Sequence, residues 1–218
     1  MSPRHQIVAS LVLSGLWAVA FLVAVSSDSV YPVLGGVSGV VVMLSIVVSV
    51  RRARSAGVSW WSTLRPRFLD VGLGVLVGLL TVAATHVGYR LIGASIPSLA
   101  DDVERLQQVA AVTPHRLGLV VVIAVAEELI WRGLLLGALR RVGWSTIMAT
   151  VSSAFVYGLA QVGPRSLWLV VAACGLGVVW GALRCVGGPS GGPSGGLWRA
   201  IVAHLVWTIA ILGVVPLR

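Results

Sequence analysis

Long apolar stretches, each close to the length of a membrane crossing, recur along the whole chain. They cover residues 6–26, 31–50, 69–93, 116–139, 143–162, 166–184 and 197–215. The hydrocarbon core of a bilayer is about 30 Å thick and needs roughly 20 apolar residues per helical crossing. Lipid offers the backbone no hydrogen-bond partner, so each stretch should be a helix. The pattern predicts an all-α, polytopic transmembrane helical bundle of about seven spans in one membrane domain.

Two connecting segments have patterns of their own. Residues 98–112, SLADDVERLQQVAAV, repeat apolar side chains at helical spacing. We expect an interfacial helix there that begins with a Ser98-x-x-Asp101 cap, stops at Pro114 and lies on the outer membrane surface, in a position to cover a cavity. Residues 187–196, GGPSGGPSGG, predict a flexible linker.

Composition supports a membrane protein and excludes an ordinary soluble domain. Hydrophobic residues make up 57% of the chain and charged residues 11%, and the mean hydropathy is +0.97. All 16 basic residues are arginines, and the formal net charge is +9. These arginines punctuate the apolar spans and form no solvated basic face, so we expect contacts with lipid headgroups and no nucleic-acid partner.

The distribution of charge along the connections predicts the orientation of the chain. Arginines cluster after the second and fourth spans, whereas the connections after the first and third spans hold Asp28, Asp101, Asp102 and Glu104. Cytoplasmic loops carry the excess of arginine in membrane proteins. We therefore expect a multi-pass protein of the cell membrane with a cytoplasmic N-terminus and an external C-terminus.

Three charged side chains lie in the middle of the fourth span, in the stretch AEELIWRGLL. A charge at this depth costs about 2.5–3.5 kcal/mol on insertion scales, and such residues are usually functional. Glu128 and Arg132 are four residues apart and can pair on one helix face. Glu127 is rotated by about 100° from Glu128 and can face another helix. A pair that only stabilises the bundle would explain Glu128 and Arg132, but it leaves Glu127 without a partner.

Two later spans carry polar residues that could converge with this acidic pair. Tyr157 and Gln161 lie one turn apart in the fifth span, and His204 and Thr208 lie one turn apart in the seventh. Each pair occupies one helical face, as a site in the interior of a bundle requires. His86, near the outer end of the third span, is interpreted as a snorkelling or capping residue.

These residues together resemble one protein family. The pattern Glu127-Glu128-x-x-x-Arg132, followed by a polar residue on the next span and a histidine on a late span, resembles the CAAX prenyl protease and bacteriocin-processing (CPBP) family, the Abi-type intramembrane endopeptidases. The first motif matches over the fifteen residues EELIWRGLLLGALRR, with Trp131 where phenylalanine is usual. The resemblance implies a protease core at 116–218, preceded by N-terminal spans and the interfacial helix at 1–115.

The resemblance also implies roles for individual residues. Glu127 would be the base that activates the attacking water, Glu128 and Arg132 would support it, and His204 would stabilise the tetrahedral intermediate. Two positions depart from the family pattern. Gln161 replaces the usual histidine of the second motif, beside Tyr157 in place of phenylalanine, and Thr208 replaces an asparagine or aspartate. Glutamine donates a hydrogen bond but takes up no proton.

These patterns lead to one leading hypothesis and two alternatives. The leading hypothesis is an intramembrane endopeptidase that acts on a membrane-associated peptide or protein. A catalytically silent relative that binds or scaffolds membrane proteins is the alternative, and a transporter or proton relay through Glu127 is a third. Glu127, Glu128 and His204 are the available metal ligands, and a catalytic zinc site normally has three good ones. We expect no cofactor. The sequence does not exclude one kind of cofactor, a divalent metal such as zinc.

Overall fold

The computed structural model describes residues 2–26, 30–55, 66–186 and 196–217. Within these ranges the chain is helical and contains no strand, which confirms the predicted all-α class. The predicted linker at 187–196 lies outside the described residues except for Gly196. Asp28 and Arg65, which contributed to the predicted orientation, also lie outside them.

The helices are named here in chain order with their bounds. They are α1 (Pro3–Ser26), α2 (Val30–Ser55), α4 (Phe68–Ile92), η1 (Gly93–Ser95), α5 (Pro97–Val109), η2 (Pro114–Arg116), α6 (Leu117–Glu128), η3 (Leu129–Leu135), α7 (Leu136–Arg141), α8 (Thr146–Ala160), α9 (Leu167–Cys185), α10 (Leu197–Ile209) and η5 (Ala210–Val214). Two of these, η3 and η5, are π-helical.

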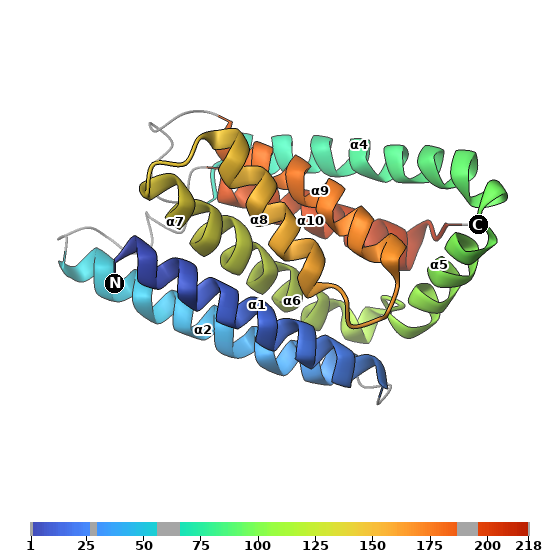
Figure 1. Cartoon of the computed structure of the whole chain (residues 1–218), viewed down its shortest axis with the longest axis horizontal. Coiled ribbons are helices and arrows are strands. Elements are labelled where there is room, and N and C mark those ends of the chain that lie inside the picture. The colour runs from blue at the N-terminus through green and yellow to red at the C-terminus, as the bar shows by residue number, and fades with distance from the viewer. Residues whose placement is uncertain (1, 27–29, 56–65, 187–195, 218) are drawn as a thin grey trace.

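The helices form an elongated bundle with the termini at opposite ends (Figure 1). Helices α1 and α2 lie together along one side, and α4 lies along the other. Helices α6 to α10 lie between these sides. Helix α5 lies at the end of the bundle where the C-terminus is found.

Five of the described helices are long and apolar enough to cross a membrane: α1, α2, α4, α9 and α10 continued through η5. The predicted fourth span is divided among α6, η3 and α7, which run without a break from 117 to 141. The predicted fifth span is α8, an apolar helix of 15 residues. The number of apolar helices among the described residues is therefore roughly consistent with the predicted number of spans.

Local turn chemistry explains why α8 begins three residues later than expected. Gly143 has a φ of 93°, a left-handed conformation that favours glycine and ends the preceding helix. Ser145 is the N-cap of α8, and its Oγ accepts a hydrogen bond from the backbone N–H of Met148 at 3.2 Å. The helix ends at Ala160, so Gln161 is its C-cap.

The predicted interfacial helix is α5, but its predicted start and end were wrong. It begins at Pro97 after Ile96, without a side-chain cap from Ser98. Proline suits the first position of a helix because its φ is already helical. The N–H that proline lacks would have no hydrogen-bond partner within the helix at this position. The helix ends at Val109, five residues before Pro114.

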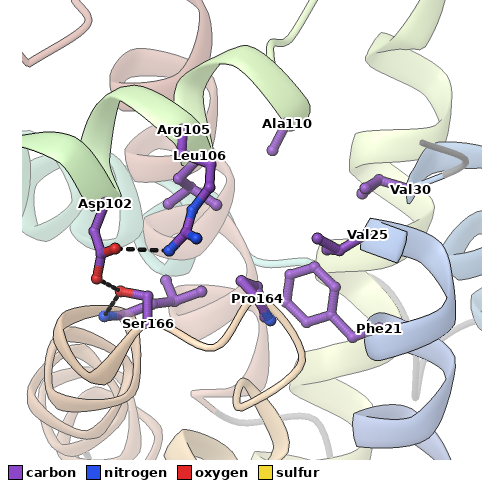
Figure 2. A pocket seen from close by; sticks show the side chains of 10 residues that line it. Phe21, Val25, Val30, Asp102, Arg105, Leu106, Ala110, Pro164 and Ser166 are labelled. Atoms are coloured by element: carbon purple, nitrogen blue, oxygen red, sulfur yellow. Dashed lines mark hydrogen bonds and ion pairs between the residues drawn. The ribbon is translucent and has the colours of Figure 1, made fainter. Parts of the chain in front are cut away.

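Helix α5 covers a small cavity of about 20 Å³ at its end of the bundle (Figure 2). Asp102 of α5 holds it to the α8–α9 connection, since Asp102 Oδ2 accepts a hydrogen bond from Ser166 Oγ at 2.5 Å. Asp102 also pairs with Arg105 at 2.6 Å. Phe21, Val25 and Pro164 line the cavity opposite α5. No residue of the acidic motif lines it.

Helices α4 and α10 pack closely because glycines on α4 face valines on α10. A Cβ at Gly74 would lie 2.7 Å from Val202, and a Cβ at Gly78 would lie 2.7 Å from Val206. Small residues of this kind let transmembrane helices approach each other closely. At the other end of the same face, Asp70 pairs with Arg199 at 2.6 Å. Helix α4 is thereby fixed to the helix that carries His204.

Candidate active site

The acidic pair lies at the end of α6, where the helix widens into the π-helical stretch η3. Glu127 and Glu128 are both buried, and Glu128 has no exposed surface. The backbone N–H of Leu136 bonds to the carbonyl of Trp131, five residues earlier, as in a π-helix. Arg132 lies inside this stretch. Such π-helical turns occur frequently at functional sites.

Glu128 and Arg132 form the ion pair that their spacing predicts. Arg132 Nη1 lies 3.1 Å from Glu128 Oε1, and both side chains are at most 1% exposed. The guanidinium carbon also lies 4.4 Å from the ring centre of Tyr157 and 5.3 Å from that of Trp180. Aromatic faces attract cations, more strongly where water is excluded. Arg132 is therefore held by one carboxylate and two rings.

Glu127 turns away from Arg132 and contacts α8. Tyr157 Oη donates a hydrogen bond to Glu127 Oε2 at 3.1 Å, and Gln161 Nε2 donates one to Oε1 at 3.3 Å. Tyr157 and Gln161 are both 5% exposed. Both oxygens of Glu127 are therefore fixed from one helical face, as the spacing of the two α8 residues predicts.

His204 of α10 lies between the two carboxylates. Its Nδ1 is 2.9 Å from Glu128 Oε1, and its Nε2 is 3.4 Å from Glu127 Oε2. An ionised carboxylate accepts hydrogen bonds and donates none, so Nδ1 carries a hydrogen in the contact with Glu128. The second nitrogen is then the one that faces Glu127. The contact between His204 and Glu128 was not predicted from the sequence.

Thr208 is the one sequence-predicted site residue for which the described residues show no hydrogen bond, ion pair or ring contact with this cluster. It lies one turn beyond His204 and is partly buried. Within the described residues its hydroxyl makes no hydrogen bond to Glu127, Glu128 or His204. The other six, Glu127, Glu128, Arg132, Tyr157, Gln161 and His204, come together in the bundle interior.

Trp180 of α9 completes the cluster and was missed by the sequence analysis. Its ring lies 4.1 Å from that of His204, at an interplanar angle of 18°, so the two rings are stacked. The indole is completely buried. A tryptophan within an apolar span carries no polar pattern that would have marked it as a site residue.

Helix α1 contacts the helix that carries the acidic motif through Trp131, and this contact was also not predicted. Trp131 Nε1 donates to Ser14 Oγ at 2.9 Å, and Trp17 packs edge-on against the Trp131 ring at 5.6 Å. From α8, Ser153 Oγ donates to the Trp131 backbone carbonyl at 2.7 Å. Trp131, which precedes Arg132 in the motif, is thereby held by two further helices, α1 and α8.

The available ligands fit a metal ion poorly. Among the described residues, no three His, Cys, Asp or Glu side chains are placed to bind one. The nearest candidates already engage one another, since His204 uses one nitrogen on each glutamate. The position where the family pattern has a second histidine holds Gln161, and an amide is a weak zinc ligand.

A comparison with protein families agrees with this geometry. Residues 110–210 match the family model described as type II CAAX prenyl endopeptidase Rce1-like. Over this segment the chain is similar to that family. The Rce1-like segment contains the whole buried cluster, from Glu127 to His204, and the resemblance inferred from the motifs is confirmed. No curated protein and no solved structure matches the chain.

The family and the apolar helices together define the class of protein. The chain is a multi-pass membrane protein. Its Rce1-like segment relates it to membrane-embedded endopeptidases, a class of hydrolases. Helices α1, α2 and α4 lie outside the matched segment, yet α1 contacts the acidic helix through Trp131.

Proposed function

We propose that the protein is an intramembrane endopeptidase in which Glu127 activates a water molecule for attack on a peptide bond. The observation that carries this proposal is the position of Glu127. Its carboxylate is buried, oriented by Tyr157 and Gln161, and 3.4 Å from the imidazole of His204. A carboxylate fixed beside a hydrogen-bond donor can remove a proton while the donor stabilises the oxygen that becomes negative.

The proposed reaction has two proton-transfer steps. Glu127 takes one proton from water as the resulting hydroxide bonds to the scissile carbonyl carbon. The carbonyl oxygen becomes negative and accepts a hydrogen bond from His204 Nε2–H. The C–N bond then breaks, the carbonyl re-forms, and Glu127 gives its proton to the leaving nitrogen. The glutamate is thereby restored for the next turnover.

The remaining residues have supporting roles in this proposal. When His204 donates from both nitrogens it carries a positive charge, and Glu127, Glu128, Arg132 and His204 then sum to zero. A neutral set of paired charges is the arrangement that a buried site tolerates. Gln161 orients Glu127 through its amide N–H and takes no part in proton transfer, because an amide is not a base.

We propose a membrane-associated peptide or protein as the substrate. The cluster lies in the interior of a bundle whose outer surface carries many exposed apolar side chains, including Leu16, Met43 and Leu79. Such a surface faces lipid, so a chain that reaches the site must itself approach from the membrane or its interface. We further place the catalytic core at 116–218, with the N-terminal helices as its support.

The proposed orientation keeps the N-terminus in the cytoplasm and the C-terminus outside. The end of α2, the α7–α8 connection and the end of α9 lie at the same end of the bundle as the N-terminus (Figure 1). Arg140 and Arg141 end α7, Arg184 is in the last turn of α9, and Arg199 is in the first turn of α10, so all four lie at this end of the bundle. The excess of arginine there supports a cytoplasmic location.

A test of the proposal is cleavage of quenched peptide libraries by the purified protein in lipid nanodiscs. The reaction is run in water enriched in ¹⁸O, and the products are analysed by mass spectrometry. We expect cleavage, with ¹⁸O in the new carboxyl group, because water supplies that oxygen. Cleavage without ¹⁸O in the product would contradict direct attack by water.

The alternative, a catalytically silent relative, rests on Gln161 and Thr208. The variant Gln161→His distinguishes the two, because it restores the side chain that the family pattern has at this position. If the native protein cleaves no peptide and Gln161→His does, the native protein is the silent form. If both cleave, Gln161 is compatible with catalysis.

A further inference from the structure

Trp180 is the largest side chain in contact with His204, and it comes from a helix that supplies none of the sequence-predicted site residues. It lies in the C-terminal half of α9 and has no exposed surface. Its ring centre is 4.1 Å from that of His204. Trp207 packs edge-on against the same indole at 6.2 Å, so Trp180 is itself held in place.

Two contacts together determine the orientation of the His204 ring. The hydrogen bond from Nδ1 to Glu128 Oε1, 2.9 Å long, fixes the direction of one ring edge. It still allows the ring to tilt through small coupled rotations about the Cα–Cβ and Cβ–Cγ bonds. The parallel stack against Trp180, at 18°, fixes the plane of the ring and removes this tilt. With both contacts present, Nε2 must point toward Glu127.

The indole contributes its face to the site, and its N–H has no partner there. Trp180 Nε1 is buried and has no hydrogen-bond partner among the described residues. The face, by contrast, contacts His204 and lies 5.3 Å from the guanidinium carbon of Arg132. The arrangement therefore depends on a flat aromatic ring at position 180 more than on a polar group.

We propose that Trp180 is a positioning residue that holds the His204 imidazole in the plane in which Nε2 faces Glu127. This inference rests on the proposed function for its catalytic consequence. The orientation of the ring is a property of the protein alone and can be measured without a substrate. Displacement of a catalytic group by about 1 Å can lower a rate by about 10²-fold.

The first test uses NMR of the protein in micelles with isotope-labelled histidine. The chain contains four histidines, and the His204 signals are assigned by their loss in His204→Gln. We expect the ring protons of His204 to be shifted upfield by the indole beneath them. Trp180→Leu should abolish this shift, and Trp180→Phe should keep most of it. The control Trp144→Leu removes a half-exposed tryptophan elsewhere and should leave the shift intact.

The second test measures peptide cleavage by the same variants. We expect Trp180→Leu to lower kcat by about 10²-fold with little change in KM, and Trp180→Phe to recover most of the loss. The proposal is overturned if Trp180→Leu loses the upfield shift yet keeps its kcat. It is also overturned if Trp180→Phe keeps the shift and is as inactive as Trp180→Leu, because the N–H would then be the required group.

The two tests separate this inference from the proposed function. If the native protein cleaves no peptide in any condition, the proposed function fails. NOEs between the His204 and Tyr157 rings, which lie 6.4 Å apart, then decide whether Trp180 orients His204, and unchanged NOEs in Trp180→Leu would overturn the inference. An unshifted His204 signal in the native protein would overturn the inference even if cleavage is observed.

Discussion

At the scale of single residues, the site is a connected set of contacts among charged and polar side chains in an apolar interior. Arg132 contacts Glu128, His204 contacts both glutamates, and Glu127 accepts hydrogen bonds from Tyr157 and Gln161. Burying an unpaired charge costs free energy of folding. Removing one partner of a buried pair leaves the other charge buried without compensation and destabilises the protein. The contacts thus make each residue dependent on its neighbours for stability as well as for chemistry.

The ion pair between Glu128 and Arg132 gives a prediction about stability. Arg132→Gln should lower the free energy of unfolding by about 3–5 kcal/mol, because Glu128 loses its arginine partner while still buried. The double variant Glu128→Gln/Arg132→Gln should lose clearly less than the sum of the single variants, since neither charge is left alone. Reversible unfolding by denaturant in mixed micelles measures all three. Purely additive losses would contradict a direct interaction of the two side chains.

The sequence predicted those contacts that follow from spacing within one helix. Glu128 and Arg132 are four residues apart, and Tyr157 and Gln161 share one face of α8, so their mutual positions follow from helix geometry. The contact of His204 with Glu128 depends on how α10 is rotated against α6, which no spacing determines. Trp180 lies in a run of apolar residues, where a site residue and a packing residue have the same pattern. Thr208 was placed in the site by its motif position, and its hydroxyl makes no hydrogen bond to the cluster within the described residues.

At the scale of elements, the acidic helix changes its hydrogen-bonding pattern within the motif itself. The π-helical stretch Leu129–Leu135 follows directly after Glu128. Ser153 and Ser14 bind the backbone and the ring of Trp131 in this stretch. Such contacts from neighbouring helices can stabilise a widened turn that is unfavourable in isolation. Because these partners come from other helices, the motif sequence alone predicted an ordinary α-helix.

The packing of α4 on α10 gives a prediction that compares two glycines on one helix. Gly78→Ala should destabilise the protein by roughly 1–3 kcal/mol, because the added Cβ would lie 2.7 Å from Val206 and 3.0 Å from the carbonyl oxygen of Ala203. Gly88→Ala has open space around its Cβ. It should leave stability unchanged or raise it by up to about 1 kcal/mol, since alanine favours a helix.

Thermal unfolding in detergent measures both glycine variants under one set of conditions. NMR spectra of the same variants can also be recorded. The Gly78→Ala side chain forces α4 and α10 slightly apart, and because α10 carries His204, we expect the His204 signals to move. Equal stability of Gly78→Ala and Gly88→Ala would contradict the close contact between α4 and α10.

At the scale of the whole molecule, the apolar stretches predicted the helical bundle and its approximate number of spans. Stretch length and the need to satisfy backbone hydrogen bonds in lipid are enough for that prediction. Element ends were less well predicted, as α5 and α8 show, because they depend on single residues such as Pro97 and Gly143. The arrangement of the helices around the cluster followed from no pattern in the sequence.

The orientation of the bundle gives a prediction for intact cells. In a background with both native cysteines, Cys174 and Cys185, replaced by serine, single cysteines are introduced as Ser2→Cys or Ser98→Cys. Both serines are exposed. Ser2 directly precedes α1, and Ser98 lies in α5, which is at the opposite end of the bundle from the N-terminus (Figure 1). A membrane-impermeant maleimide should label Ser98→Cys in intact cells, and Ser2→Cys only after the cells are opened. The opposite labelling would reverse the proposed orientation.

The central claim is that Glu127 is the base that activates water, and one comparison of variants tests it most directly. Glu127→Gln keeps the shape of the side chain and removes its ability to take a proton, whereas Glu104→Gln makes the same change on the exposed face of α5. The kcat of peptide cleavage is measured for both in lipid nanodiscs. We expect a loss of about 10²–10⁴-fold for Glu127→Gln and a near-native rate for Glu104→Gln. An unchanged kcat in folded Glu127→Gln would contradict the claim.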